Sequence, residues 1–339
     1  MAAMKQNIIT LLLIIVLSLS ACGQSPEDAR KELGQLNIPY SESSFIESAA
    51  NGDMMAVKLF LAAGMNVNSE NGMALVYAVQ KGRTEIVETL LDAGADVNKR
   101  TPLIAALRQN QVEIVKILLG KGADVNIENG IGLRIAANSG HIVLVKLLLD
   151  KGADITLRTS EGETALMDAV REGHIEIVKL LLDKGANGAD GGVLWVAIQN
   201  GRTELVNLLL DKGADANVKT RTNQTALMEA IRLGQPEIIK LLLDKGADAN
   251  VKDQNNKTAL IMALEIDGRY NKNKNDIIRT LLGQAKGIDV NVNNFYGTGK
   301  GRALLCYRCN KVLELIQDNS EIAQNIAEFL SFHNSLTPY

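Results

Sequence analysis

The chain has 339 residues, with 36 basic and 39 acidic side chains and a net charge of −3. This balance excludes the strong positive field that nucleic-acid binding needs, so we expect no nucleic-acid partner. With 5 Pro, 29 Gly and 4% aromatic residues, the composition indicates helices punctuated by glycines rather than several unrelated globular domains.

Residues 1–21 have the features of a lipoprotein signal peptide. Lys5 precedes an apolar stretch from Ile8 to Leu19, which as a helix is too short to cross a ~30 Å hydrocarbon core. The stretch ends in Leu19-Ser20-Ala21-Cys22, which resembles a bacterial lipobox; the alternative is a plain secretory signal with an incidental cysteine. The resemblance implies cleavage before Cys22, acylation of its thiol and new amino group, and stable membrane anchoring. Gly23 in place of Asp implies an outer-membrane lipoprotein facing the periplasm.

Residues 22–40 follow the lipidated cysteine, and we expect a short tether helix there. Ser25-Pro26-Glu27-Asp28 combines a capping hydroxyl, a first-turn proline and acidic residues near the positive end of the helix dipole.

The body of the chain is an internal repeat with two landmarks. The first is a glycine after a leucine-rich run, at Gly64, Gly94, Gly122, Gly152, Gly185, Gly213, Gly246 and Gly287. The second is the position of Thr in Thr-Ala-Leu, occupied by Ser43, Met73, Thr101, Ile131, Thr164, Gly192, Thr225, Thr258 and Arg302. From this Thr slot to the next glycine there are 21 residues in each of the first seven repeats, so the length varies between the glycine and the next slot.

The constant segment predicts two antiparallel helices. In the fifth repeat Thr164 can cap the first helix, and Ala169 keeps that helix slim enough for close stacking. Gly173 can adopt the left-handed conformation that a turn needs, and Gly185 ends the second helix, which has an apolar face from Ile175 to Leu182. Neither helix buries this face alone, so neighbouring repeats must supply the core.

These repeats resemble the ankyrin-repeat family over residues 41–319. The resemblance implies an all-α fold, an ankyrin-repeat solenoid of about nine helix-turn-helix repeats with short hairpin fingers. A final amphipathic segment within residues 320–339 is expected to form a C-terminal capping helix. The usual His after Thr-Pro-Leu is missing throughout, and its slot holds Ile104, Arg134, Met167, Trp195, Met228 and Ile261.

Hairpin length points to the partner-binding region. The hairpins before Met73, Thr101, Ile131 and Gly192 are clipped, whereas those before Thr164, Thr225 and Thr258 are full length. Ankyrin-family proteins generally bind on hairpin tips and exposed first-helix positions, so we expect a protein partner between repeats five and eight. The candidate contact residues are Asp168, Arg171, Glu172, Gln199, Asn200, Arg221, Asn223, Glu229, Arg232 and Asn255.

Catalytic chemistry has little support in the sequence. There is no nucleophile elbow, phosphate loop or metal motif, and we expect no enzyme activity, no cofactor and no metal site. Cys306 and Cys309 form a Cys-Tyr-Arg-Cys pair that could form a disulfide in an oxidising envelope. A thiol-redox site is the alternative, although the chain shows no βαβ context for one.

The combination of lipid anchor and repeats resembles envelope lipoproteins that act as immunity proteins. These neutralise a periplasm-acting phospholipase delivered by a type VI secretion system, so the resemblance implies a secreted phospholipase toxin as partner. The alternative is a general periplasmic ankyrin scaffold in envelope or oxidative-stress resistance. In either case we expect a monomer when the chain is free.

Overall fold

The computed structural model describes residues 25–266 and 273–284, which form two compact units. Unit 1 ends at Asp168 and unit 2 begins at Ala169, so the division falls within one helix, α11 (Ala165–Glu172). Besides helices, these residues contain one isolated β-bridge, between Lys219 and Thr225. Among the described helices, none has the length and apolar character needed to cross a membrane.

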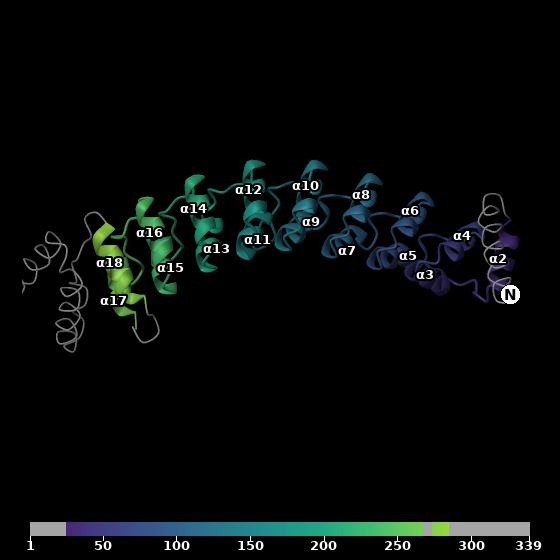
Figure 1. Ribbon diagram of the computed structural model, residues 1–339, viewed down its shortest axis with the longest axis horizontal. Helices are drawn as coiled ribbons and strands as arrows, with labels where there is room; N and C mark the ends of the chain where they lie inside the picture. Colours follow the sequence, from purple (N-terminus) through teal and green to yellow (C-terminus); the bar gives the residue numbers. More distant parts are fainter. Residues whose placement is uncertain (1–24, 267–272, 285–339) are drawn as a thin grey trace, which may run out of the picture. The chain divides into compact units, whose positions relative to one another are not determined.

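Unit 1 is a stack of helical pairs, which can be followed in Figure 1. Its helices are α2 (Pro26–Gln35), α3 (Glu42–Asn51), α4 (Met54–Ala62), α5 (Ser69–Gln80), α6 (Thr84–Asp92), α7 (Pro102–Arg108), α8 (Val112–Gly120), α9 (Ile127–Asn138), α10 (Ile142–Asp150) and the start of α11. The first helices of the pairs, α3, α5, α7 and α9, contact one another in order, as do the second helices α4, α6, α8 and α10. Each repeat therefore packs against its chain neighbours.

Unit 2 repeats this arrangement. After the rest of α11 it contains α12 (Ile175–Asp183), α13 (Gly191–Gln199), α14 (Thr203–Asp211), α15 (Ala226–Leu233), α16 (Pro236–Asp244), α17 (Ala259–Glu265) and α18 (Lys274–Gln284). Here α13, α15 and α17 stack in order, and so do α14, α16 and α18. The described residues thus contain eight helical pairs. The predicted ninth repeat near Arg302 and the capping helix within 320–339 lie outside them.

The fifth repeat confirms the local predictions. The hydroxyl of Thr164 accepts a 3.2 Å hydrogen bond from the Met167 N–H and so caps α11. Gly173 and Gly185 follow the two helices with φ angles of +83° and +95°, in the left-handed region that glycine adopts without steric cost.

The core is formed by apolar residues that recur at the same places in each second helix. In α12 they are Ile177, Val178 and Leu181, all at most 2% exposed. Burial of one such side chain contributes about 1.5–3 kcal/mol, and the regular spacing repeats this contribution in each second helix. The slim Ala169 of the first helix is fully buried, as expected for close helix contact.

Asparagine side chains join consecutive repeats. The amide of Asn68 donates to the Gly94 carbonyl at 3.0 Å and accepts from the Asp96 N–H at 2.9 Å. Asn98 and Asn126 make the same pair of bonds within unit 1, and Asn217 makes it within unit 2. In the sixth repeat of the chain this position is Ala189, whose side chain has no hydrogen-bonding atom.

Three of the four clipped connections enter their helices through left-handed residues. Three consecutive residues at the start of α5, Glu70 to Gly72, have positive φ angles, and Glu128 to Gly130 in α9 repeat the pattern. Thr101 is also left-handed, at φ +53°, and its side chain does not cap α7. At these three connections a tight left-handed turn takes the place of a hydroxyl cap and costs about 1–2 kcal/mol per non-glycine residue. The clipped connection before Gly192 instead ends in Asp190, whose carboxylate caps α13 by accepting the Gly192 N–H at 2.9 Å.

Helix α2 is present where the sequence predicted a tether helix, and Ser25 caps it. It is packed on α4, because Ala29 and Leu33 are fully buried. The side chain of Arg30 donates to the Ala63 carbonyl at 3.2 Å. This helix therefore covers the first repeat.

Candidate functional site

Three full-length hairpins share one backbone turn. We call them finger 1 (residues 157–163), finger 2 (218–224) and finger 3 (251–257). Each is closed by a backbone hydrogen bond between its third and seventh residues: Thr159 to Glu163 at 3.0 Å, Thr220 to Gln224 at 2.9 Å, and Asp253 to Lys257 at 3.0 Å. The predicted full length of these hairpins is confirmed.

The third residue of each finger also holds the turn with its side chain. The hydroxyl of Thr159 accepts the N–H groups of Glu161 and Glu163, both at 3.2 Å. In finger 3 the carboxylate of Asp253 accepts from Asn255 and Lys257 at 2.8 and 2.9 Å. Thr and Asp are typical of turns because their short side chains bond the backbone two residues on. The tip is therefore ordered by its own residues.

Fingers 2 and 3 are bonded to each other within unit 2. The N–H of Gln254 donates to the Thr222 carbonyl at 3.3 Å. The side-chain amide of Asn223 donates to the Lys252 carbonyl. Because these bonds join one tip to the base and tip of the next, the two fingers present one continuous polar surface.

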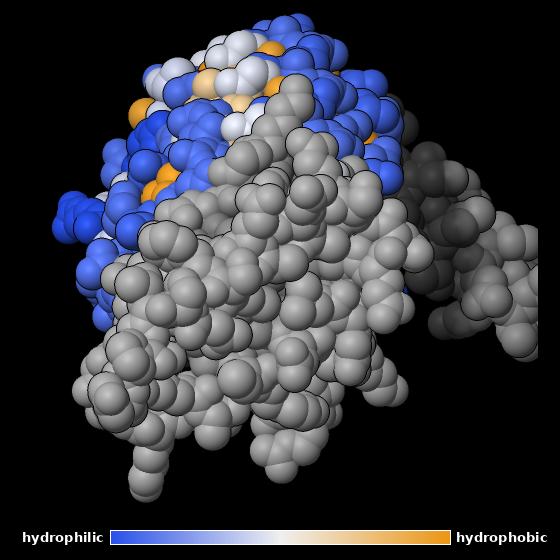
Figure 2. All heavy atoms as spheres, turned by 90° about the vertical axis from the view of Figure 1, so that its left-hand side faces the viewer, coloured by the Kyte–Doolittle hydropathy of each residue, from blue (hydrophilic) through white to orange (hydrophobic). Residues whose placement is uncertain are grey.

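A hollow of about 370 Å³ lies between α15, finger 3 and α17. It is lined by Ile231, Arg232, Asp253, Asn255, Lys257, Met262, Glu265 and Ile266. Two of the predicted contact residues, Arg232 and Asn255, therefore come together. The coloured atoms in the view onto the end of unit 2 are mostly hydrophilic (Figure 2).

Glu229 and Arg232 form an ion pair at the edge of this hollow. The guanidinium donates to both carboxylate oxygens, at 2.8 and 2.6 Å. We expected Glu229 to be exposed, and this is wrong: its side chain is 5% exposed, whereas that of Arg232 is 55% exposed. The hydrogen bonds that Arg232 donates to Glu229 raise the pKa of Arg232 above its ordinary value. Arg232 is therefore a permanent cation held by a buried acid.

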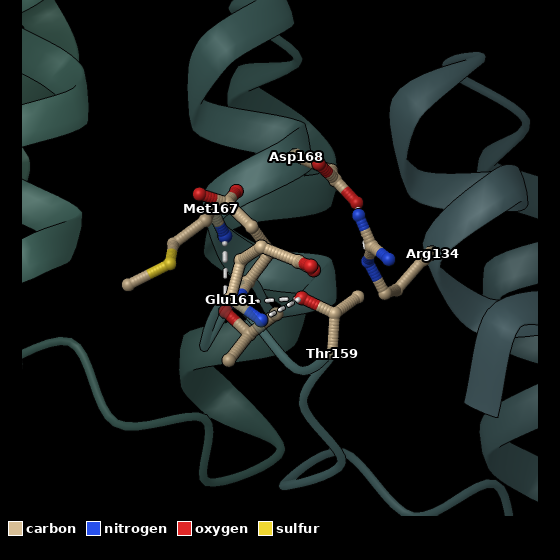
Figure 3. A network of polar contacts seen from close by, with 7 residues as sticks. Arg134, Thr159, Glu161, Met167 and Asp168 are labelled. Atoms are coloured by element: carbon tan, nitrogen blue, oxygen red, sulfur yellow. Dashed lines mark hydrogen bonds and ion pairs between the residues drawn. The ribbon is translucent and has the colours of Figure 1, made fainter. Parts of the chain in front are cut away.

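Asp168 occupies the same position of its repeat as Glu229, four residues after the capping Thr. Its expected exposure is also wrong, because its side chain is 5% exposed. Its carboxylate accepts a 2.8 Å bond from Nε of Arg134, and the two side chains point toward each other in Figure 3. Arg134 fills the slot of the missing histidine, so an ion pair between repeats takes the place of the family's usual residue.

Glu161 of finger 1 lies near the same cation (Figure 3). Hydrogen bonds from Ser160 and Thr159 lower the pKa of its carboxyl group, and the charge of Arg134 contributes in the same direction. Finger 1 therefore keeps its negative charge to lower pH than an ordinary glutamate would.

The structure does not bring the remaining candidates into the hollow. Arg171 is half-buried, and its carbonyl accepts two N–H groups of Arg202 at 3.1 and 2.8 Å. The other candidates are exposed: Glu172, Gln199 and Asn200 on first helices, and Arg221 and Asn223 on finger 2. Their role in binding stays a prediction.

Sequence reasoning missed two charged residues that line the hollow, Lys257 and Glu265. They form an ion pair at 2.6 Å, with side chains 39% and 30% exposed. Lys257 is the last residue of finger 3, and Glu265 stands seven residues after the capping Thr258, the position that Arg232 has in its own repeat. Extending the repeat alignment to this position would have identified Glu265.

Three cysteines of functional interest, Cys22, Cys306 and Cys309, lie outside the described residues. Within the part of the chain that is described, no group of three or more His, Cys, Asp or Glu side chains could hold a metal ion.

Stacked helical pairs joined by ordered fingers define the class of repeat proteins that bind other proteins with their fingers and first helices. The chain belongs to the ankyrin-repeat family, because the family model for three copies of the ankyrin repeat matches residues 1–100, 45–129, 131–191 and 194–294. A solved structure, the ankyrin repeat domain of Bcl-3, described as a unique member of the IkappaB protein family, is 27% identical with a TM-score of 0.53. The match covers 61% of this chain and 96% of that one. Comparison with curated proteins finds no significant match.

Proposed function

We propose that this protein is a non-enzymatic, protein-binding scaffold that is anchored by lipid in the bacterial envelope and acts as an immunity protein. In this proposal it binds and neutralises a periplasm-acting phospholipase effector of a type VI secretion system. The observation that carries the binding role is the hollow of unit 2, where Arg232 of α15 meets Asn255 and Lys257 of finger 3, the finger that is bonded to finger 2. Ankyrin repeats support protein partners and a scaffold rather than a catalyst.

The lipid anchor is supported by the lipobox-like Leu19-Ser20-Ala21-Cys22 and the Gly23 that follows it. The test is labelling of growing cells with a palmitate analogue, comparing the natural chain with Cys22→Ala. We expect label and outer-membrane fractionation for the natural chain, and loss of both in the variant. Equal labelling of the two chains would contradict the anchor.

The immunity role predicts a phospholipase gene next to the gene of this protein. The two products, purified separately, should form a tight complex in isothermal titration calorimetry, and the complex should lose lipase activity. A strain without this protein should die when it meets siblings that deliver the toxin, and the natural chain supplied in trans should rescue it. Normal survival of the deletion strain would contradict this role.

The same deletion strain distinguishes the immunity role from the second candidate function, a general periplasmic scaffold in envelope or oxidative-stress resistance. Sensitivity of the deletion strain to peroxide without any toxin phenotype would favour that scaffold. A thiol-redox role of Cys306 and Cys309 would instead require insulin-reduction activity that is lost in Cys309→Ser.

A further inference from the structure

Fingers 2 and 3 carry an unbalanced positive charge on an otherwise weakly acidic protein. Finger 2 contains Lys219 and Arg221 and no acid, and finger 3 contains Lys252 and Lys257 with Asp253 as its one acid. Asp253 is 8% exposed, and its carboxylate accepts two backbone N–H groups of its own turn. It is therefore buried in the turn, and the outer surface of the two fingers is cationic.

Most of this charge is not neutralised by other side chains. Lys219, Arg221 and Lys252 are exposed, and none has an ion-pair partner among residues 25–266 and 273–284. Exposed cations attract an approaching anion over about a Debye length, roughly 8 Å at physiological salt. These three side chains are therefore available to a partner.

Arg232 adds a cation in a fixed orientation. Two of its N–H groups are held by the buried Glu229, and a guanidinium has five N–H donors in a planar fork. The remaining donors belong to a side chain that is 55% exposed and lines the hollow beside Asn255. An acceptor that enters the hollow meets a guanidinium whose orientation is already fixed, which reduces the entropy lost on binding.

We propose that fingers 2 and 3, together with Arg232, form the docking surface for an acidic segment of the protein partner. The carboxylates of this segment pair with Arg221 and Lys252 on the fingers and with Arg232 in the hollow. This inference rests on the proposed protein-binding function and specifies the chemistry of the partner.

A peptide fits this surface better than a nucleic acid or an anionic membrane. The hollow holds the Lys257–Glu265 ion pair beside Arg232, so its cations are interrupted by a carboxylate and suit the separated carboxylates of a peptide better than a continuous row of phosphates. None of the residues that line the hollow is aromatic, so it offers no platform for stacking a base. Gln254 and Asn255 at the tip carry amides that can both donate to and accept from a peptide backbone.

The test uses the full-length chain and short peptides in isothermal titration calorimetry. The probes are a peptide of alternating glutamate and glycine and the same peptide with glutamine. A single-stranded oligonucleotide and phosphatidylglycerol vesicles are tested in parallel. The variant is Arg221→Glu/Lys252→Glu, which changes two exposed side chains. Its matched control is Lys146→Glu/Lys240→Glu, which makes the same charge change on the exposed faces of α10 and α16.

We expect the glutamate peptide to bind in a salt-dependent way, and the finger variant to bind it roughly tenfold more weakly than the control variant. No binding of the glutamate peptide, equal binding by the two variants, or preferred binding of the oligonucleotide or the vesicles would overturn the proposal. Thermal unfolding of both variants verifies that they are folded.

The candidate phospholipase separates this proposal from the function on which it rests. If the phospholipase binds and the finger variant binds it as well as the control does, the docking surface is wrong and the immunity function stands. If the acidic peptide binds through the fingers and the phospholipase does not bind at all, the immunity function is wrong and the surface stands.

Discussion

Finger 1 of unit 1 and fingers 2 and 3 of unit 2 have the same backbone and opposite charge. All three are closed between their third and seventh residues, and all three have a left-handed residue at the sixth, which is Gly162, Asn223 or Asn256. Finger 1 carries one cation against two acids, whereas fingers 2 and 3 together carry four cations against one acid. The turn thus depends on a few residues that bond the backbone, and the other positions can vary with the partner.

The buried acids beside the fingers, Asp168 and Glu229, also differ between the two units, in the way each is paired with a cation. Asp168 takes its cation from the preceding repeat, and the Arg134 side chain is only 21% exposed. Glu229 takes its cation from the next turn of its own helix, and Arg232 stays 55% exposed. The first arrangement joins two repeats, and the second displays a charge. Equivalent acids therefore join two repeats in unit 1 and orient an exposed cation in unit 2.

The largest expected effect is on stability and distinguishes these two acids. Arg134→Met removes the cation that offsets burial of the Asp168 carboxylate, and we expect the free energy of unfolding of unit 1 to fall by about 2–4 kcal/mol. Arg232→Met should cost unit 2 less, about 1–2 kcal/mol, because that pair lies closer to water. Hydrogen exchange of amides in α9 and α15 measures the two units separately, with Lys146→Met as control. Equal losses of unfolding free energy in Arg134→Met and Arg232→Met would contradict this difference between the two ion pairs.

The turn that the three fingers share can be tested by a substitution at the left-handed sixth residue of a finger. Gly162 has a φ of +87°, and a Cβ atom there would meet no atom within 4 Å, so Gly162→Ala tests backbone conformation alone. We expect the free energy of unfolding to fall by about 1–2 kcal/mol. The control is Gly120→Ala at the end of α8, which also meets no atom but lies at an ordinary helical φ. A loss at Gly120 as large as at Gly162 would contradict the explanation.

One more asparagine bridge between repeats is expected to stabilise unit 2. Ala189 holds the bridging position, and its N–H is already bonded to the Asn187 side chain at 3.1 Å, as the Asn98 N–H is to Asp96. Ala189→Asn should therefore add the missing bonds to the next repeat and raise the free energy of unfolding by about 0.5–1.5 kcal/mol. Urea denaturation measures the change. Ala189→Ser, which is too short to bridge, should not reproduce it.

The smallest effect concerns the acidity of finger 1. Because hydrogen bonds from Ser160 and Thr159 lower the pKa of Glu161, its contribution to stability is present above the unfolded value of about 4.3. This contribution is lost as the pH falls through the lower folded value. Carboxyl NMR titration should show Glu161 titrating below an ordinary glutamate, and Ser160→Ala should move the pKa back upward. An unchanged pKa in the variant would exclude the Ser160 hydroxyl as its main cause.

The sequence was sufficient for the helical pairs and for the lengths of the fingers. Its constant 21-residue segment predicts two short helices. Residues such as Thr164 and Gly173 begin or end a helix within a few residues of their own position. Local chemistry of this kind can be read along the chain. The left-handed run from Glu128 to Gly130 could not be predicted in this way, because it depends on how a short connection joins two stacked helical pairs.

The candidate site was harder to predict, because it too depends on how neighbouring repeats are stacked. Helical periodicity placed Asp168 and Glu229 on an exposed face, but the stacking of neighbouring repeats covers that face at the fourth residue after the capping Thr. The pairing of Arg134 with Asp168 spans 34 residues and depends on the length of both side chains. Arg232 and Asn255 were identified because exposed tips and exposed helix ends keep their exposure after stacking.

The closed base of each finger has a consequence for how such a protein changes over generations. A hairpin that holds its own turn can lengthen or shorten while the 21-residue pairs keep their packing, since the helices of successive repeats contact one another directly. A single insertion or deletion can therefore replace one recognition surface by another in one step. A lineage of such proteins could thus follow a changing partner by altering its hairpins while its core stays the same.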